Sequence, residues 1–300
     1  MQNRRNFIKQ ASVLVAGGVA APHLLSSCGE GTGTAKVSKY LGLQLYSFRG
    51  MIGLEGIEKV LQVAAELGYN SLETASYGEG KFYGKNPAEF KKMVEDLGMK
   101  LTSSHIGRDI SDNRDADIDW WKRAAEAHSA AGMKYMIIPS GPFREGRRGT
   151  EVQKVPLDHV KRYCDFYNDL ALITAGAGMQ FGYHNHDFEF LSKIDDIPVY
   201  DLLLANTNPN NVLFQLDVYW IKKGGYEPVD YMKKYPKRYK VLHIKDELAI
   251  GAHNTVNYKA VFDQAYEIGV QDWYVEVERY DETTDLKRSA DYLLNADFVK

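Results

Sequence analysis

The chain has 300 residues, a formal net charge of −3, 44% hydrophobic residues and 26% charged residues. This is the composition of an ordinary globular protein. The small negative charge argues against a nucleic-acid-binding surface, since such surfaces are strongly basic. The length alone allows one large domain or two smaller ones.

The first 28 residues predict an export signal. Arg4 and Arg5 precede Phe-Ile-Lys, an apolar run covers 11–21, and Leu-Ser-Ser leads to Cys28. A basic start, a short apolar core and small residues before a cleavage point are typical of such signals. The paired arginines resemble a twin-arginine export signal, and Leu-Ser-Ser-Cys resembles a bacterial lipobox in which Cys28 is lipidated. The alternative is an ordinary signal peptide with a chance cysteine.

We therefore expect an exported protein, periplasmic or held on a bacterial envelope membrane by a lipid anchor alone. Residues 1–28 are the expected signal segment, 29–37 a flexible Gly/Thr-rich tether and 38–300 the catalytic domain. Cys164 is the only other cysteine, so acylation of Cys28 leaves no intrachain disulfide. The fold must then depend on its hydrophobic core, which a domain of this length can supply.

Strand-like and helix-like segments alternate beyond the tether. Eight segments are expected to be strands, at 41–46, 71–74, 100–105, 135–139, 180–186, 212–217, 239–245 and 273–278. Five glycines stand where helices are expected to end, because glycine adopts the left-handed conformation of that position: Gly68, Gly98, Gly132, Gly178 and Gly269. This rhythm predicts a single-domain (β/α)8 TIM barrel. An open doubly wound sheet is the alternative, but no Gly-x-Gly-x-x-Gly follows the first strand.

The last four expected strands each carry, near the carboxyl end, a residue of a type that binds metals. These residues are His184, Asp217, His243 and Glu276, separated by 33, 26 and 33 positions. Adjacent strands of a barrel lie about 5 Å apart, so four such ends can meet at one ion. Two imidazoles and two carboxylates suit Mn, Zn, Co or Fe(II) better than Ca. His186 shares a strand face with His184, so either histidine is a candidate ligand.

Four strand-end motifs carry a resemblance to a known family. They are Tyr-His-Asn-His-Asp-Phe-Glu at 183–189, Leu-Asp at 216–217, His-Ile-Lys-Asp at 243–246 and Trp-Tyr-Val-Glu-Val-Glu at 273–278. Over residues 38–300 the chain resembles the sugar phosphate isomerase/epimerase family, the xylose isomerase-like TIM barrels that also include endonuclease IV. The resemblance implies one divalent metal, often Mn, held by His184, Asp217, His243 and Glu276. It also implies substrate contacts from Lys245, His105 and Glu73.

The sequence departs from the family pattern at one position. Ketose epimerases and isomerases of this family usually have a glutamate where His184 stands, and it works with the glutamate of the last strand as an acid/base pair. His186 is the expected substitute, since a neutral imidazole transfers protons near pH 7.

These observations predict a metal-dependent isomerase or epimerase that acts on a sugar or keto-sugar through an enediolate. Glu276 or His186 is the expected base, and Lys245 is expected to stabilise charge on the substrate oxygen. Glu189, Trp220 and Glu278 complete the expected substrate contacts. Two alternatives stay open: a lyase or hydratase that cleaves a 3-keto-glycoside by β-elimination, and a non-catalytic sugar-binding lipoprotein. The expected partner is a small carbohydrate, with no nucleic acid; the oligomeric state stays open.

Overall fold

The computed structural model describes residues 39–148, 151–278 and 282–300. Residues Lys39–Lys300 form one compact unit. The expected signal segment, the tether and the lipidation site at Cys28 lie outside the described residues. Within the described part of the chain, no helix has the length and apolar character needed to cross a membrane.

Eight parallel strands close into a barrel in the order β1-β12-β11-β10-β7-β4-β3-β2. This finding confirms the predicted (β/α)8 TIM barrel, and the open-sheet alternative is wrong. The strands are β1 Gly42–Gln44, β2 Ser71–Thr74, β3 Lys100–His105, β4 Tyr135–Ile138, β7 Gln180–His184, β10 Val212–Asp217, β11 Tyr239–Lys245 and β12 Asp272–Glu276.

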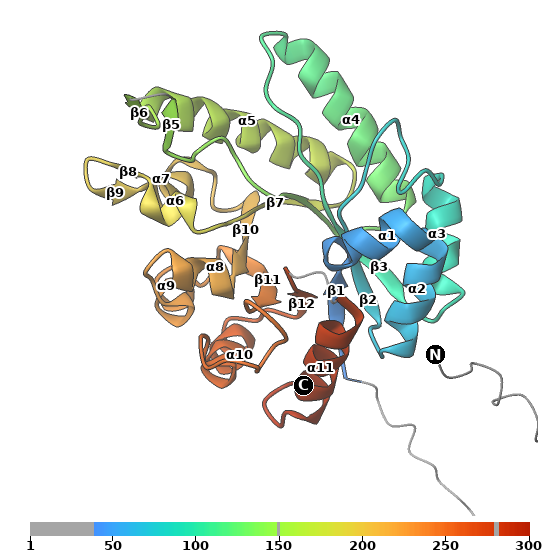
Figure 1. The fold of residues 1–300 in the computed structure, drawn as a ribbon. Coiled ribbons are helices and arrows are strands. Elements are labelled where there is room, and N and C mark those ends of the chain that lie inside the picture. Colours follow the sequence, from blue (N-terminus) through green and yellow to red (C-terminus); the bar gives the residue numbers. More distant parts are fainter. Residues whose placement is uncertain (1–38, 149–150, 279–281) are drawn as a thin grey trace, which may run out of the picture. The chain divides into compact units, whose positions relative to one another are not determined.

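Helices surround the strands, as Figure 1 shows. They are α1 Arg49–Glu55, α2 Ile57–Glu66, α3 Pro87–Glu95, α4 Arg114–Ala130, α5 Leu157–Gly176, α6 Phe188–Leu191, α7 Val199–Asn206, α8 Val218–Lys223, α9 Pro228–Lys234, α10 Tyr258–Glu267 and α11 Glu282–Asn295, with a 3-10 turn at Leu45–Phe48. Two hairpins lie on the connections, β5 Gly146–Arg148 with β6 Glu151–Gln153, and β8 Lys193–Ile194 with β9 Ile197–Pro198. All five glycines expected at helix ends have positive φ angles, between 75° and 91°.

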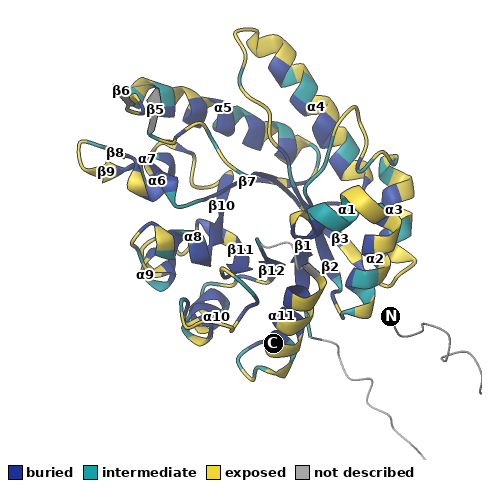
Figure 2. Cartoon of the chain, in the orientation of Figure 1, coloured by how far each residue is buried: buried dark blue, intermediate teal, exposed yellow. Residues whose placement is uncertain are grey.

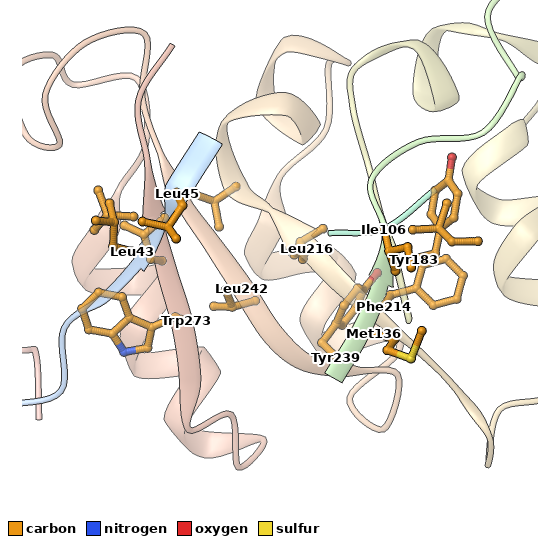
Figure 3. Close-up of a cluster of buried hydrophobic side chains, with 14 of the residues drawn as sticks. Leu43, Leu45, Ile106, Met136, Tyr183, Phe214, Leu216, Tyr239, Leu242 and Trp273 are labelled. Atoms are coloured by element: carbon orange, nitrogen blue, oxygen red, sulfur yellow. The ribbon is translucent and has the colours of Figure 1, made fainter. Parts of the chain in front are cut away.

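The larger hydrophobic core lies between the strands and the helices. In Figure 2 the strands and the inward faces of the helices are buried, whereas the outer helix faces are exposed. Figure 3 shows part of this core, where Met136, Tyr183 and Phe214 gather from neighbouring strands and Leu242 and Trp273 from others. Strands covered in this way can be apolar along their whole length.

A second, smaller cluster fills the inside of the barrel toward the amino ends of the strands. It consists of Tyr135, Ile137, Leu213, Val241 and Tyr274. Side chains of a strand alternate between its two faces, so the inward series of β10 continues from Leu213 to Gln215 and Asp217. The inward series of β11 likewise continues from Val241 to His243 and Lys245. The barrel interior therefore changes from apolar to polar toward the carboxyl ends of its strands.

Candidate functional site

Four neighbouring strands bring the expected metal ligands together. Each of His184, Asp217, His243 and Glu276 offers one ligand atom, and these four atoms lie within 4.8 Å of one another. The strand register explains this convergence, because Asp217 pairs with His243 and Lys245 pairs with Glu276 on adjacent strands. All four side chains are buried. Of the two candidate histidines, the structure places His184, the last residue of β7, in the cluster, whereas His186 lies two residues beyond the strand.

Asp217 has one oxygen committed to the fold and one that is free for a ligand. Its Oδ1 accepts hydrogen bonds from the backbone N–H groups of Tyr219 and Trp220, at 2.9 and 2.7 Å, and so caps α8. Its Oδ2 has no hydrogen-bond partner among the described residues and lies 3.9 Å from both Nε2 of His184 and Nδ1 of His243. Burial raises the pKa of Asp217 to about 7. An unpaired buried acceptor is costly, so this oxygen fits a site for a cation.

His243 is held between two carboxylates. Its Nδ1 lies 2.8 Å from Oε2 of Glu276, and its Nε2 lies 2.5 Å from Oε2 of Glu73. Burial by itself would lower the pKa of His243, but the charges of Glu73 and Glu276 and their hydrogen bonds raise it to about 10. A metal-binding histidine commonly donates its second N–H to a carboxylate, which fixes the ring. Nδ1 of His243 faces the cluster, so Glu73 is the carboxylate that accepts the N–H of the second nitrogen, Nε2.

Glu73 has hydrogen-bond donors at both of its oxygens. Oε2 accepts from the Gln44 amide at 2.6 Å, besides His243, and Oε1 accepts from Ser103 at 2.6 Å and from Gln215 at 2.8 Å. Burial opposes ionisation of Glu73, but His105, His243 and Ser103 together lower its pKa to about 2. Glu73 is fully buried, and it is not among the residues that line the cleft described below. Its expected role as a substrate contact stays a prediction.

Lys245 brings a buried positive charge to the edge of the cluster. Its Nζ lies 2.5 Å from Oε1 of Glu278 and 3.2 Å from Oε2 of Glu276. It also lies 4.9 Å from the centre of the Trp220 ring. Burial would lower the pKa of Lys245, but Glu276, Asp217 and Glu278 raise it above its ordinary value. The ammonium group therefore stays protonated beside the cluster, where it can stabilise charge on a ligand oxygen.

A cleft of about 460 Å³ opens above the cluster at the mouth of the barrel. Expected site residues line it together with residues from the strand-end loops: Tyr46, Ala75, Tyr77, His105, Ile106, Gly107, Pro139, Ser140, His184, His186, Glu276 and Glu278. Burial lowers the pKa of His186 to about 4, so its imidazole is neutral at pH 7. The structure thus brings the expected bases Glu276 and His186 to one cavity.

Two expected substrate contacts lie elsewhere. Both oxygens of Glu189 are occupied, Oε1 by the Tyr183 hydroxyl at 2.6 Å and Oε2 by the backbone N–H of His186 at 2.8 Å. Glu189 thereby holds the turn that carries His186. Trp220 packs against His186, with ring centres 5.6 Å apart, and neither Glu189 nor Trp220 lines the cleft. The substrate contacts expected of these two residues stay predictions.

Several polar residues of the site were not expected from the sequence. Gln44, Ser103 and Gln215 surround Glu73, and Tyr46, Tyr77 and Ser140 line the cleft. Gln215 had a usable signal, since it is the one uncharged polar residue within the apolar strand 212–217 and lies two positions before Asp217. Residues two apart share a strand face, so Gln215 points into the barrel as Asp217 does.

Comparison with known proteins gives one family match. The model of the xylose isomerase-like TIM barrel family matches residues 61–296. The chain is 32% identical to a sugar phosphate isomerase/epimerase of Parabacteroides distasonis ATCC 8503, with a TM-score of 0.78 and coverage of 89% of this chain and 99% of that one. A second such structure from the same organism is 34% identical, with a TM-score of 0.77 and coverage of 87% and 100%.

A curated relative carries a different name. An inosose dehydratase of Geobacillus kaustophilus (strain HTA426) is 27% identical over 197 residues. The match spans 63% of this chain and 61% of the dehydratase. The chain is thus similar both to proteins named as isomerases or epimerases and to one named as a dehydratase.

Proposed function

The chain belongs to the xylose isomerase-like TIM barrel family, as its strand-end motifs indicated, and we propose that it is a divalent-metal-dependent isomerase or epimerase of a sugar or keto-sugar. The observation that carries this proposal is the cluster of His184, Asp217, His243 and Glu276, in which the buried Oδ2 of Asp217 is unpaired and His184 and Glu276 line the cleft.

The donor set agrees with a transition metal. Two imidazole nitrogens and two carboxylate oxygens suit Mn²⁺, and also Zn²⁺, Co²⁺ or Fe²⁺, better than they suit Ca²⁺. A divalent ion held by these four side chains would act as a Lewis acid toward carbonyl and hydroxyl oxygens of the substrate. We propose Mn²⁺ as the native ion.

The chain's own residues supply proton transfer and charge. Glu276 is ionised, because Lys245 and His243 lower its pKa against the effect of burial. It lines the cleft, as the neutral His186 does, and either can accept a proton from the carbon beside a carbonyl group. Lys245 stays protonated and stabilises negative charge on the adjacent oxygen, which favours an enediolate. Return of the proton to a neighbouring carbon, or to the opposite face, gives isomerisation or epimerisation.

A lyase reaction is the second candidate, and one observation favours it. His184 stands where a two-base epimerase has a second carboxylate, so Glu276 is the only carboxylate of the four-residue cluster that also lines the cleft. β-Elimination needs a single base: the proton leaves the carbon beside the carbonyl, a carbon–carbon double bond forms, and the β carbon–oxygen bond breaks. The leaving oxygen takes up a proton. The inosose dehydratase relative bears a name consistent with elimination.

The product distinguishes the two reactions. Mn-loaded protein is mixed with keto-sugars and 3-keto-glycosides in D₂O and followed by NMR. An isomerase or epimerase gives an isomer with deuterium at the reacting carbon, whereas a lyase releases an alcohol or water and gives an unsaturated ketone. A sugar-binding protein without activity gives neither product.

Two variants test the assigned residues. Lys245→Met leaves all four ligands in place, so we expect it to retain the metal and to lose about 100-fold in kcat. Glu276→Gln is expected to lose both activity and metal affinity. Substitution of Lys39, which is remote from the site in sequence, by Met is the matched control. Full activity of Lys245→Met would remove the role assigned to Lys245.

We also propose that the protein is exported and lipid-anchored, which bears on its substrate. Support comes from Arg4, Arg5 and the Leu-Ser-Ser-Cys motif ending at Cys28. Outside the cytoplasm, a free sugar or glycoside is a better candidate than a phosphosugar. Radiolabelled palmitate should label the chain expressed in a bacterial host with both pathways, and Cys28→Ser should abolish the label. Labelling of Cys28→Ser would contradict the anchor.

A further inference from the structure

A second cavity adjoins the cleft at the barrel mouth. It has a volume of about 380 Å³ and lies between the loops that follow β3 and β4 and helix α5. Gly107, Pro139 and Ser140 line both this cavity and the cleft above the metal cluster. A Cβ atom placed on Gly107 would lie 3.6 Å from Cδ of Pro139. The two cavities therefore share three lining residues and adjoin each other.

The walls of the second cavity combine aromatic faces with polar groups. Tyr163, Phe166 and Tyr167 of α5 form one wall and are buried, and Ile110 and Ile138 add aliphatic surface. Aromatic rings beside a few polar groups are typical of small-molecule sites that take flat or sugar rings. The wall thus offers a surface on which a ring can stack.

Polar and charged groups line the second cavity beside the aromatic rings. The lining includes Arg108, Asp109 and Ser140, and the Tyr163 and Tyr167 side chains each carry a hydroxyl group. Burial raises the pKa of both Tyr163 and Tyr167, and the Asp109 carboxylate at the rim adds to the effect on each. A carboxylate and two phenol groups thus line one cavity, and together they can bind hydroxyl groups of a ligand.

We propose that this cavity is the subsite for a second, hydroxyl-bearing ring, joined through a glycosidic oxygen to the keto-sugar ring in the cleft. This inference rests on the proposed function, because the metal cluster places the first ring. A single ring occupies one cavity and leaves the aromatic wall of the other without a ligand. A keto-disaccharide reaches both cavities and stacks its second ring on that wall. The substrate class is accordingly a keto-glycoside in which the group attached through the glycosidic oxygen is a second sugar. A lyase would release this sugar, and an isomerase or epimerase would retain it.

The test compares a keto-disaccharide with the methyl keto-glycoside of the same first ring. Binding to the Mn-loaded Lys245→Met protein is measured by calorimetry, so that turnover does not consume the ligand, and turnover is measured with the wild-type protein. We expect the disaccharide to bind about 10-fold more tightly. Ile110→Trp fills the second cavity and is expected to abolish this preference while leaving methyl glycoside binding within about twofold.

Two further variants make the result decisive. Ile197→Trp, the same substitution at an exposed site on β9, is the matched control and should change neither affinity. Tyr167→Phe keeps the ring packing and removes only the hydroxyl, so it should weaken disaccharide binding alone by a few fold. Equal affinities of Lys245→Met for the disaccharide and the methyl glycoside would overturn the subsite. A preference for the disaccharide that survives Ile110→Trp would overturn it as well. A preference without turnover of either compound would overturn the proposed reaction and leave the subsite standing.

Discussion

The Nε2 atom of His105 lies 2.6 Å from the side-chain oxygen of Gln215. The amide nitrogen of Gln215 donates to Glu73, which fixes the orientation of the amide and leaves its oxygen toward His105. Nε2 of His105 must then be the donor, and Nδ1 is the unprotonated nitrogen of the neutral ring. Burial lowers the pKa of His105, which keeps the ring neutral. One glutamine thus sets the tautomer of a cleft histidine.

Removal of this glutamine should reduce activity without removing the metal. Gln215→Leu takes away the acceptor for His105 and one donor to Glu73, so the ring loses its fixed tautomer. We expect kcat/KM on the wild-type substrate to fall about 10- to 100-fold. The metal content, measured by plasma mass spectrometry, should stay near one per chain. Gln264→Leu, at a buried glutamine of α10, is the control. Unchanged kinetics in Gln215→Leu would contradict the tautomer argument.

The contact between Glu73 and His243 predicts that loss of the Glu73 carboxylate lowers the metal affinity and leaves KM unchanged. Glu73→Gln removes the ionised partner of Nε2 of His243, so we expect metal affinity to fall about 10- to 100-fold. KM at saturating metal should stay near the wild-type value, because Glu73 lies below the cleft lining. The measurements are metal titration and steady-state kinetics, with the exposed Glu66→Gln as control. A raised KM with normal metal affinity would instead support a direct substrate contact.

The sequence predicted the strands well, because apolar runs and helix-ending glycines are local signals. β2, β3, β10 and β11 have the expected bounds, β4 and β7 end one or two residues early, and β1 and β12 differ by one or two residues at both ends. The metal cluster was predictable for a related reason. Once a barrel is assumed, the ends of consecutive strands must meet, so Asp217, His243 and Glu276 could be grouped with a histidine of the 180–186 strand, although the choice between His184 and His186 needed the structure.

The hydrogen bonds that hold the site residues in place were not predictable in the same way. Gln215 and Glu73 are 142 positions apart, and they meet only because β10 and β2 face each other across the closed barrel. A register shift between β2 and β3 at Leu72–Glu73 places Ser103 opposite Glu73, and no local pattern shows such a shift. The role of Glu189 also depends on tertiary contact, since the Tyr183 hydroxyl occupies one of its oxygens.

Asp217 allows its two roles to be separated by one substitution. Asn caps a helix as well as Asp does, so Asp217→Asn should keep the hydrogen bonds from Tyr219 and Trp220 to Oδ1. The same change replaces the charged Oδ2 with an amide, and we expect the metal content to fall well below one per chain. Added Mn²⁺ should raise the Tm of the wild-type protein by mass action and leave that of Asp217→Asn unchanged.

Asp201→Asn, on α7, is the matched control and should show the wild-type Tm response. A large drop in the metal-free Tm of Asp217→Asn would show that the carboxylate matters mainly to the fold. Full metal content in the variant would exclude Asp217 from the ligand set.

Glu189 provides a pH-dependent test that does not involve the metal ligands. Burial raises the pKa of Glu189 from its ordinary value of 4.5 to about 7, although the bonds from Tyr183 and the His186 backbone oppose this. Between those two pH values the folded chain keeps a proton that the unfolded chain has released. The free energy of unfolding should therefore fall as pH rises from about 4.5 to 7, by up to about 3 kcal/mol from this group.

The difference between wild type and Glu189→Gln isolates this effect, because other titrating groups contribute equally to both. The variant cannot ionise at this position. Its free energy of unfolding in urea should therefore depend less steeply on pH between 4.5 and 7, and position 189 should add no pH dependence above pH 7. Glu126→Gln, at an exposed position of α4, should reproduce the wild-type slope. If the wild type and Glu189→Gln have parallel profiles from pH 4.5 to 7, Glu189 is ionised in the folded chain. Its hydrogen bonds from Tyr183 and His186 then outweigh its burial.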